Sequence, residues 1–324
     1  MQSSRAPHPR FHDRVSARRD DAAAELARSL NAIPASIAPK HFYDPLGSAL
    51  FSAICELPEY YPTRTEAAIF TRHRDEIAAR IGRGATLIDL GAGDCAKAAR
   101  LFDVLAPAQY VAVDISTAFV EQVLERLQRE RPEIGMIGVG VDFTAEMWLP
   151  DSVRAERRVF FYPGSSIGNF GPAEAVAFLR RVRERTDPDG GLLIGVDLAK
   201  SASIVEPAYD DALGVTAAFN LNVLNGVNRL LGADFAIADW RHVAFLDPVQ
   251  GRIEMHLEAR RALEVRWPGG GRRFAAGERI HTENSYKYER EVFDAVLRDA
   301  GFAPQASWTD PAGWFAVVHA VPAR

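Results

Sequence analysis

The stretch from Thr86 to Phe102, TLIDLGAGDCAKAARLF, constrains the fold of this chain more than any other part of it. Five apolar or β-forming residues lead into Gly91-Ala92-Gly93, and the spacing of apolar residues then becomes helical. This order predicts a strand, a glycine turn and a helix. Because Gly91 and Gly93 carry no Cβ, a ligand can approach the backbone of the turn closely and meet the free N–H groups of the helix.

Asp114 ends the next apolar run, Tyr110 to Val113. A carboxylate at the end of a strand can accept hydrogen bonds from both hydroxyls of a ribose, so the two features together predict a cofactor that carries a nucleoside. Two cofactors fit. Gly91, Gly93 and Ala96 match the dinucleotide fingerprint G-x-G-x-x-[GA] with an acid about twenty residues later. S-adenosylmethionine uses the same geometry without a pyrophosphate.

Strands and helices alternate after this turn. We predict strands at 86–90, 110–114, 136–141, 158–162 and 191–197, and helices at 95–105, 117–130 and 173–185. Such alternation is typical of a parallel sheet covered by helices on both faces, with ligands at the carboxyl ends of the strands. The alternation stops between 199 and 284, where we predict one helix over 207–231 and an antiparallel meander centred on Val243, Met255 and Arg279.

The chain is predicted to end with a helix over 286–300 and a hairpin that turns at 310–313. Five parallel strands followed by a helix and an antiparallel hairpin favour S-adenosylmethionine over a dinucleotide. The predicted fold is therefore α/β: a class I methyltransferase Rossmann-like sheet with a C-terminal antiparallel hairpin, plus a smaller α+β substrate-binding domain.

We predict three parts of the chain. Residues 1–61 form an N-terminal helical segment that joins the substrate domain, 62–198 and 286–324 form the methyltransferase domain, and 199–285 form the inserted substrate-binding domain. The first residues, which include His8, Arg10, His12 and Arg14, are expected to be a frayed, solvated terminus.

Composition excludes several classes of partner. The net charge of −5 argues against nucleic acid and anionic membranes, because binding to phosphates needs concentrated basic charge. The only cysteines, Cys55 and Cys95, offer no disulfide framework, and the eight histidines show no metal-ligand spacing. No apolar run is long enough to span a bilayer, and no secretory signal is visible. We expect a cytoplasmic protein without a metal that acts on small molecules.

From Lys40 onward the chain resembles the S-adenosylmethionine-dependent histidine Nα-methyltransferases that begin ergothioneine biosynthesis. Six separated motifs in the same order carry this resemblance. They are FYDPLGSALFSAICELPEYYPTR (42–64), LGAGDCAK (90–97), VDF (141–143), FYPGSSIGNF (161–170), AYDDALGVTAAFN (208–220) and HTENSYKY (281–288).

The resemblance implies S-adenosylmethionine as cofactor. Gly91 and Lys97 are then expected at its methionine part, Asp114 at the ribose, and Asp142 and Phe143 at the adenine. Lys97 could instead be a solvated lysine, although a cation in the first turn of a helix needs an anion nearby. The two aspartates could instead be turn formers at strand ends.

The resemblance also implies that the protein methylates L-histidine three times on its α-amine, through the mono- and dimethylated forms, to give hercynine. We expect a monomer. Tyr43 and Tyr60 would enclose the amine as catalytic residues. The implied substrate-binding residues are Tyr60, Asn169, Tyr209, Met255, Glu283 and Ser285. Each tyrosine could instead be a packing residue. Asn169 could cap the helix that begins near Pro172, and Thr282, Asn284 or Ser285 could cap the helix that follows.

Methyl transfer is an in-line displacement that needs a neutral amine, alignment and the exclusion of water, but no covalent nucleophile. We expect the amine proton to leave to water through tyrosine hydroxyls. Three alternatives stay open: a member of the same family that acts on another aromatic amino acid, an NAD-dependent oxidoreductase, and a non-catalytic module that binds S-adenosylmethionine.

Overall fold

The protein, in a computed structural model, is described over residues 8–15 and 19–324. It divides into two compact units. The larger unit contains the described N-terminal residues 8–15 together with Thr65–Leu198 and Tyr288–Arg324. The smaller unit contains residues 19–64 and Ala199–Lys287.

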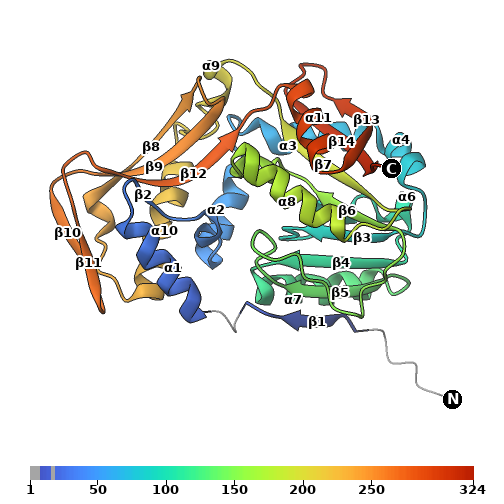
Figure 1. Ribbon diagram of the computed structural model, residues 1–324, viewed down its shortest axis with the longest axis horizontal. Coiled ribbons are helices and arrows are strands. Elements are labelled where there is room, and N and C mark those ends of the chain that lie inside the picture. The colour runs from blue at the N-terminus through green and yellow to red at the C-terminus, as the bar shows by residue number, and fades with distance from the viewer. Residues whose placement is uncertain (1–7, 16–18) are drawn as a thin grey trace. The chain divides into compact units, whose positions relative to one another are not determined.

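An eight-stranded sheet forms the centre of the larger unit, with the strand order β1-β5-β4-β3-β6-β7-β14-β13 (Figure 1). The first six strands in this order pair in parallel, and β14 and β13 add an antiparallel hairpin beside β7. The predicted fold class is confirmed. The strands are β1 (Arg10–Asp13), β3 (Thr86–Leu90), β4 (Gln109–Asp114), β5 (Gly135–Gly140), β6 (Arg158–Tyr162), β7 (Gly191–Asp197), β13 (Phe302–Thr309) and β14 (Phe315–Pro322).

Helices cover both faces of this sheet. Phe161 of β6 belongs to the core on one face, together with residues of α3, α4, α6 and α7. Tyr162 points to the other face, where its ring centroid lies 5.2 Å from that of Phe178 in α8. All five residues of β3 are buried, as expected for a parallel strand covered on both sides. The helices are α3 (Tyr61–Arg72), α4 (Arg74–Ile81), α5 (Ala96–Ala99), α6 (Phe102–Leu105), α7 (Thr117–Glu130), α8 (Pro172–Glu184) and α11 (Arg290–Asp299).

The predicted helix over 95–105 is two short helices, α5 and α6. The Leu101 N–H bonds to the Ala98 carbonyl at 2.9 Å, three residues back, and this tight turn interrupts the i→i−4 ladder. The predicted helix over 286–300 begins only at Arg290, because strand β12 continues to Tyr286. Glu289 is its N-cap, so the hypothesis that Thr282, Asn284 or Ser285 caps this helix is wrong.

The smaller unit contains a four-stranded sheet of order β2-β12-β9-β8 and a separate hairpin, β10-β11. The meander β8-β9-β12 is present, and β8 and β9 are centred as predicted, but Arg279 is the first residue of β12 and not its centre. The hairpin β10-β11 was not expected. The strands are β2 (Ala35–Ser36), β8 (Trp240–Asp247), β9 (Arg252–Ala259), β10 (Leu263–Trp267), β11 (Gly270–Phe274) and β12 (Arg279–Tyr286). The helices are α1 (Arg19–Asn31), η2 (Pro39–Phe42), α2 (Pro45–Cys55), α9 (Ala202–Val205), α10 (Val215–Leu231) and η4 (Ile237–Asp239).

The long helix α10 begins at Val215 rather than at residue 207. The carboxylate of Asp211 accepts hydrogen bonds from the backbone N–H groups of Val215 at 2.9 Å and Thr216 at 2.7 Å, and thereby caps the first turn. Gly214 precedes the helix with φ of +74°. Leu213, which falls inside the predicted helix, therefore lies before the observed one and is 80% exposed.

The N-terminus is the clearest correction. Residues 10–13 are not frayed but form β1, which pairs in parallel with β5 at the edge of the sheet (Figure 1). Residues 8–15 thus belong to the larger unit, not to the predicted N-terminal helical segment 1–61. The expectations for residues 1–7 and 16–18 lie outside the described part of the chain. The other unit boundaries lie within three residues of the predicted ones.

Candidate functional site

The glycine turn after β3 is held by the acid that follows β4. The two oxygens of the Asp114 carboxylate accept hydrogen bonds from the backbone N–H groups of Gly93 at 2.9 Å and Ser116 at 2.8 Å. Gly91 and Gly93 have φ of +72° and +51°, a region that favours glycine. Asp114 therefore shapes the turn at the carboxyl end of the sheet, in addition to its predicted role toward a ribose.

Asp142 and Phe143 follow the neighbouring strand β5. One Asp142 oxygen accepts hydrogen bonds from the Thr144 N–H at 3.1 Å and hydroxyl at 2.5 Å. A Cβ placed on Gly91 would lie 3.7 Å from the tip of the Phe143 ring, which shows that the two positions adjoin. The structure thus brings together Gly91, Asp114 and Phe143. The Thr144 contacts also fit the turn-forming interpretation of Asp142, and the two roles are compatible because a carboxylate can accept several hydrogen bonds.

Lys97 has an anionic partner inside the protein. Its Nζ donates to Oε2 of Glu66 at 2.7 Å, and the other Glu66 oxygen accepts from the Gly164 backbone N–H at 2.7 Å. Glu66 is only 1% exposed. The anion that the position of Lys97 required is therefore supplied by the chain itself. The contact of Lys97 with the cofactor stays a prediction, and its position in a helix no longer argues for that contact.

A second buried acid, Asp89, lies in β3 just before the glycine turn. Burial raises its pKa to about 7, while the hydroxyl of Tyr110, which donates to it at 2.8 Å, and the nearby Lys97 lower it. Sequence reasoning did not single out Asp89 or Glu66. The signal was present, because a charged residue in an otherwise apolar strand such as TLIDL needs a buried partner.

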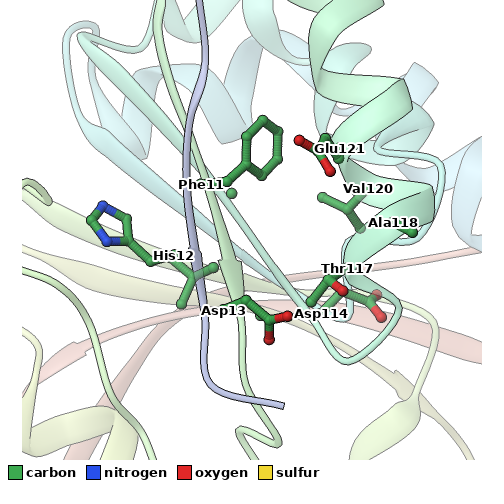
Figure 2. Close-up of a pocket in the computed structure, with 11 residues that line it drawn as sticks. Phe11, His12, Asp13, Asp114, Thr117, Ala118, Val120 and Glu121 are labelled. Carbon is green, nitrogen blue, oxygen red and sulfur yellow. The ribbon is translucent and has the colours of Figure 1, made fainter. Parts of the chain in front are cut away.

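A small cavity of about 130 Å³ lies between β1, β5 and α7, with Asp114 among the residues that line it (Figure 2). Figure 2 shows Phe11 pointing from β1 toward α7, while His12 points to the opposite side of the strand. A Cβ on Gly138 would lie 2.4 Å from the Phe11 ring, so glycine at this position lets β1 approach β5. The cavity is smaller than the ~300 Å³ that small-molecule sites usually need, so it does not fit a nucleoside.

In the smaller unit, the predicted tyrosines contact other aromatic rings. The Tyr43 ring lies 5.9 Å from Phe51 and 6.0 Å from Phe219, Phe51 lies 6.1 Å from Tyr60, and Tyr60 lies 6.3 Å from Tyr209. These centroid distances are those of contacting aromatic pairs. The motif around residue 43 and the motif around residue 209 therefore meet in one aromatic cluster.

Glu283 and Ser285 lie on β12 beside this cluster. Glu283 is paired in register with Met255 of β9, and Tyr209 and Ser285 share a hydrogen bond of 2.7 Å between their hydroxyl oxygens. Lys287, just beyond the strand, donates to both hydroxyls, at 2.9 Å to Tyr209 and 2.8 Å to Ser285. Five of the six predicted substrate residues thus belong to the smaller unit. They include or adjoin the hydrogen-bonded group of Tyr209, Ser285 and Lys287.

Burial shifts the pKa of two acidic side chains near Tyr209. It raises the pKa of Tyr60 well above 10, and the negative charges that Tyr209 and Glu283 can carry raise it further. Burial also raises the pKa of Glu283 to about 7, and the ammonium of Lys287 opposes this rise. Tyr60 is therefore a neutral phenol at neutral pH, whereas Glu283 is divided between its two protonation states.

Asn169 lies in the larger unit, at the end of the short helix η3 (Ser166–Asn169). The N-cap of α8 is Gly171, so the hypothesis that Asn169 caps that helix is wrong. Its predicted contact with the substrate stays a prediction. Ser165, just before η3, accepts no cap hydrogen bond from that helix; its hydroxyl instead accepts from the Asp197 backbone N–H at 2.8 Å.

Within residues 8–15 and 19–324, no helix has the length and apolar character to cross a bilayer. Over the same residues, His, Cys, Asp and Glu side chains form no group of three or more that could hold a metal ion.

Comparison with known proteins agrees with this geometry. Residues 22–322 match the family model described as histidine-specific methyltransferase, SAM-dependent. The chain is 41% identical to a histidine N-alpha-methyltransferase of Mycolicibacterium smegmatis, over 93% of this chain and 96% of that protein. It is 39% identical to the enzyme of the same name from Mycobacterium tuberculosis, over 90% and 92% of the two chains.

An ergothioneine biosynthesis protein 1 of Neurospora crassa is 31% identical over 82% of this chain, which spans 31% of that longer protein. The family match resolves the choice of cofactor in favour of S-adenosylmethionine and sets the NAD-dependent alternative aside. With its Rossmann-like sheet, its glycine turn and a matching segment that covers nearly all of its length, this chain belongs to the SAM-dependent, histidine-specific methyltransferase family.

Proposed function

We propose that this protein transfers methyl groups from S-adenosylmethionine to the α-amine of L-histidine, three times in succession, and releases hercynine for ergothioneine biosynthesis. The observation that carries the substrate assignment is the buried Glu283 carboxyl beside the Ser285–Tyr209 hydroxyl pair. A buried acceptor next to hydroxyl donors is complementary to imidazole and rejects rings that lack nitrogen, because its polar groups would be left unpaired.

For the cofactor, we propose that Asp114 binds the ribose hydroxyls and that Asp142 and the Phe143 N–H bind the adenine, with Gly91 and Lys97 at the methionine part. The open backbone of the turn supports this assignment, since Gly91 and Gly93 present no side chain there. Asp114 has accepting capacity beyond its two backbone hydrogen bonds, because a carboxylate offers about four lone-pair sites. The cofactor supplies the methyl group on a positively charged sulfur.

For the substrate, we propose that Asn169 donates to the carboxylate, that Tyr209 adjoins it with its hydroxyl paired to that of Ser285, and that Tyr43 and Tyr60 enclose the amine. The raised pKa of Tyr60 means that its phenol keeps its proton at neutral pH. Tyr60 therefore acts as a hydrogen-bond acceptor that orients the neutral amine, not as a phenolate base. The amine proton leaves to water before each transfer, and the residues in place provide alignment, which accounts for most of the rate.

In this proposal, the aromatic cluster of Tyr43, Phe51, Tyr60 and Phe219 determines how many methyl groups the product carries. Aromatic faces attract a quaternary ammonium by roughly 0.5–2 kcal/mol, whereas a site made only of hydrogen-bond acceptors loses contacts with each added methyl group. Mono- and dimethylhistidine are therefore expected to be good substrates, and one site performs all three transfers.

We further propose that the protein acts as a monomer in the cytoplasm. Cys55 and Cys95 are free thiols, which is consistent with a reducing compartment. Size-exclusion chromatography with light scattering gives the mass in solution, and a mass of twice 35.6 kDa would contradict the monomer.

The decisive experiment is mass spectrometry of the twenty amino acids, each incubated with the protein and S-adenosylmethionine. We expect a gain of three methyl groups on histidine and little or none on the others. Preferential methylation of tryptophan, tyrosine or phenylalanine would instead assign the protein to the other aromatic amino acids. Binding of S-adenosylmethionine without methylation of any amino acid would leave only the binding-module hypothesis.

A further inference from the structure

Lys287 is a buried cation to which no role was assigned from the sequence. It follows the last residue of β12, and because side chains alternate along a strand, it continues the face that carries Glu283 and Ser285. Lys287 is 7% exposed. Lysine is rarely buried to this extent unless it is paired, so its position needs an explanation.

Two partners of Lys287 are hydroxyls of the proposed substrate site. Its Nζ lies 2.8 Å from Oγ of Ser285 and 2.9 Å from Oη of Tyr209, and these oxygens lie 2.7 Å from each other. The three polar atoms therefore form a closed triangle. The ammonium also lies 4.7 Å from the centroid of the Tyr209 ring.

The number of hydrogens on these three groups determines which of them donate and which accept. An ammonium can only donate, so each hydroxyl oxygen accepts one hydrogen bond from Lys287. One hydroxyl must also donate to the other. The phenol of Tyr209 is the stronger acid and hence the better donor, so Ser285 accepts from both Lys287 and Tyr209. With both lone pairs filled, the Ser285 hydroxyl can only donate to a third group.

We propose, on the basis of the function proposed above, that Lys287 is a specificity-determining positioning residue that turns the Ser285 hydroxyl into an obligate donor beside the acceptor Glu283. Neutral imidazole has one N–H and one unprotonated nitrogen, so it matches a donor and an acceptor placed side by side. Phenylalanine has neither group, and the indole of tryptophan has only the N–H. Lys287 does not touch the substrate in this proposal but acts through Ser285.

The chain contains a matched control for this residue. Lys200, in the same unit, also donates to a tyrosine hydroxyl, that of Tyr61, at 3.0 Å, and lies 4.5 Å from the centroid of that ring. Lys200 and Lys287 thus make the same kind of lysine–tyrosine contact, but Tyr61 is not among the proposed substrate residues. Lys200 is only partly buried, so comparing K287M with K200M separates the proposed role from the general loss of a lysine–tyrosine contact.

The test measures histidine methylation and cofactor affinity in K287M, S285A, the double variant and K200M. We expect K287M and S285A each to raise KM for histidine about 10-fold with little change in kcat, because one hydrogen bond of ground-state binding is lost. The double variant is expected to lose about the same 10-fold, not 100-fold, since both changes remove one donor. K200M and the Kd of S-adenosylhomocysteine in all variants are expected to stay within twofold of wild type.

Additive losses in the double variant would overturn the proposal, because Lys287 would then act independently of Ser285. A wild-type KM for histidine in K287M would overturn it as well. Neither result touches the proposed function, which fails only if the wild-type protein does not methylate histidine. If circular dichroism shows that K287M does not fold, the same cycle with K287Q applies, and we expect a smaller rise in KM because the amide keeps an N–H donor without the charge.

Discussion

The two units hold the acids proposed for their sites in opposite ways. In the larger unit, the Asp114 carboxylate accepts two backbone N–H groups at the end of a parallel strand. In the smaller unit, Glu283 is buried on a strand face beside hydroxyls and a lysine, and burial raises its pKa to about 7. The first acid is fixed by backbone geometry and the second by neighbouring side chains.

This difference distinguishes a cofactor site, which the backbone of the fold provides, from a substrate site, which depends on particular side chains. The end of a strand next to a glycine turn suits any nucleoside-carrying cofactor, so its architecture is widely usable. A buried carboxyl is costly to keep, and a chain retains one only where a specific ligand or partner compensates. We therefore expect changes in the larger unit to affect all substrates equally and changes in the smaller unit to affect substrates selectively.

The largest effect is expected for Asp114→Ala. It would remove the two charge-assisted hydrogen bonds that we propose to the ribose, each worth roughly 1.5–3 kcal/mol, and it also releases the Gly93 N–H that holds the turn. Calorimetric titration should show a loss of cofactor affinity of about 10²-fold or more, with the same loss of activity on every amino acid. Asp114→Asn keeps one acceptor for the backbone and should lose less. Affinity within twofold of wild type for Asp114→Ala would show that the ribose binds elsewhere.

Glu283→Ala is expected to have the next largest effect, and a selective one. Turnover of histidine should fall by about 10²-fold, while the Kd of the cofactor and any turnover of phenylalanine or tryptophan change little, since only imidazole uses the carboxyl. Steady-state kinetics on the three amino acids test this expectation. Equal losses on histidine and tryptophan would make Glu283 a structural residue and would remove the contrast between the two units.

The same carboxyl predicts a pH dependence of stability. Its pKa is about 7 in the folded protein and near 4.5 when unfolded, so its contribution is fully present below pH 4.5 and is lost as pH rises through 7. The expected loss is about 3 kcal/mol across this window. Urea unfolding at several pH values should show a flatter profile for Glu283→Gln than for wild type. Because Asp89 titrates in the same window in both proteins, their difference isolates Glu283.

The larger unit could be predicted from the sequence because its signals are local. The apolar run into Gly91, the acid at 114 and the alternation of strands and helices each depend on adjacent residues, and the sheet follows them. The pairing of β1 with β5 could not be predicted. It joins residues more than a hundred positions apart, and a four-residue strand that contains His12 and is followed by Arg14 has no distinctive pattern.

The smaller unit was predicted in outline, but its contacts were not. Resemblance to a family supplied Tyr209, Glu283 and Ser285, whereas the triangle with Lys287 depends on how β12 meets residues far away in sequence. From the sequence, Glu283 and Ser285 are expected at the substrate, with Thr282, Asn284 or Ser285 as alternative helix caps, whereas Lys287 falls inside the helix predicted over 286–300. A correct strand assignment for HTENSYKY would have placed Lys287 on the same face as the two site residues.

A smaller effect is expected for Tyr43→Ala. Removing one ring from the aromatic cluster loses roughly 0.5–2 kcal/mol of attraction for a methylated, cationic amine, which corresponds to about 2–30-fold slower late steps. Time courses by mass spectrometry should then show mono- or dimethylhistidine accumulating. Tyr43→Phe keeps the ring and should release hercynine as wild type does. If wild type stopped at monomethylhistidine with excess cofactor, this view of the pocket would be wrong.

The smallest effect is expected for Arg14→Ala, which tests whether backbone geometry alone fixes the cofactor site. Arg14 donates to Glu146 at 3.0 Å and lies 4.2 Å from the centroid of the Trp148 ring, and both residues belong to the segment that follows Asp142 and Phe143. The Arg14 backbone N–H also bonds to Gly140 at 2.8 Å, and this bond survives the substitution. Because exposed contacts of this kind contribute about 0.5–1 kcal/mol each, we expect the Kd of S-adenosylhomocysteine to rise about 2–5-fold, with unchanged selectivity among amino acids. Arg126→Ala, on the exposed side of α7, serves as the control for loss of a surface charge. A changed preference between histidine and tryptophan in Arg14→Ala would mean that the larger unit also contributes to selectivity, which the contrast between the two units excludes.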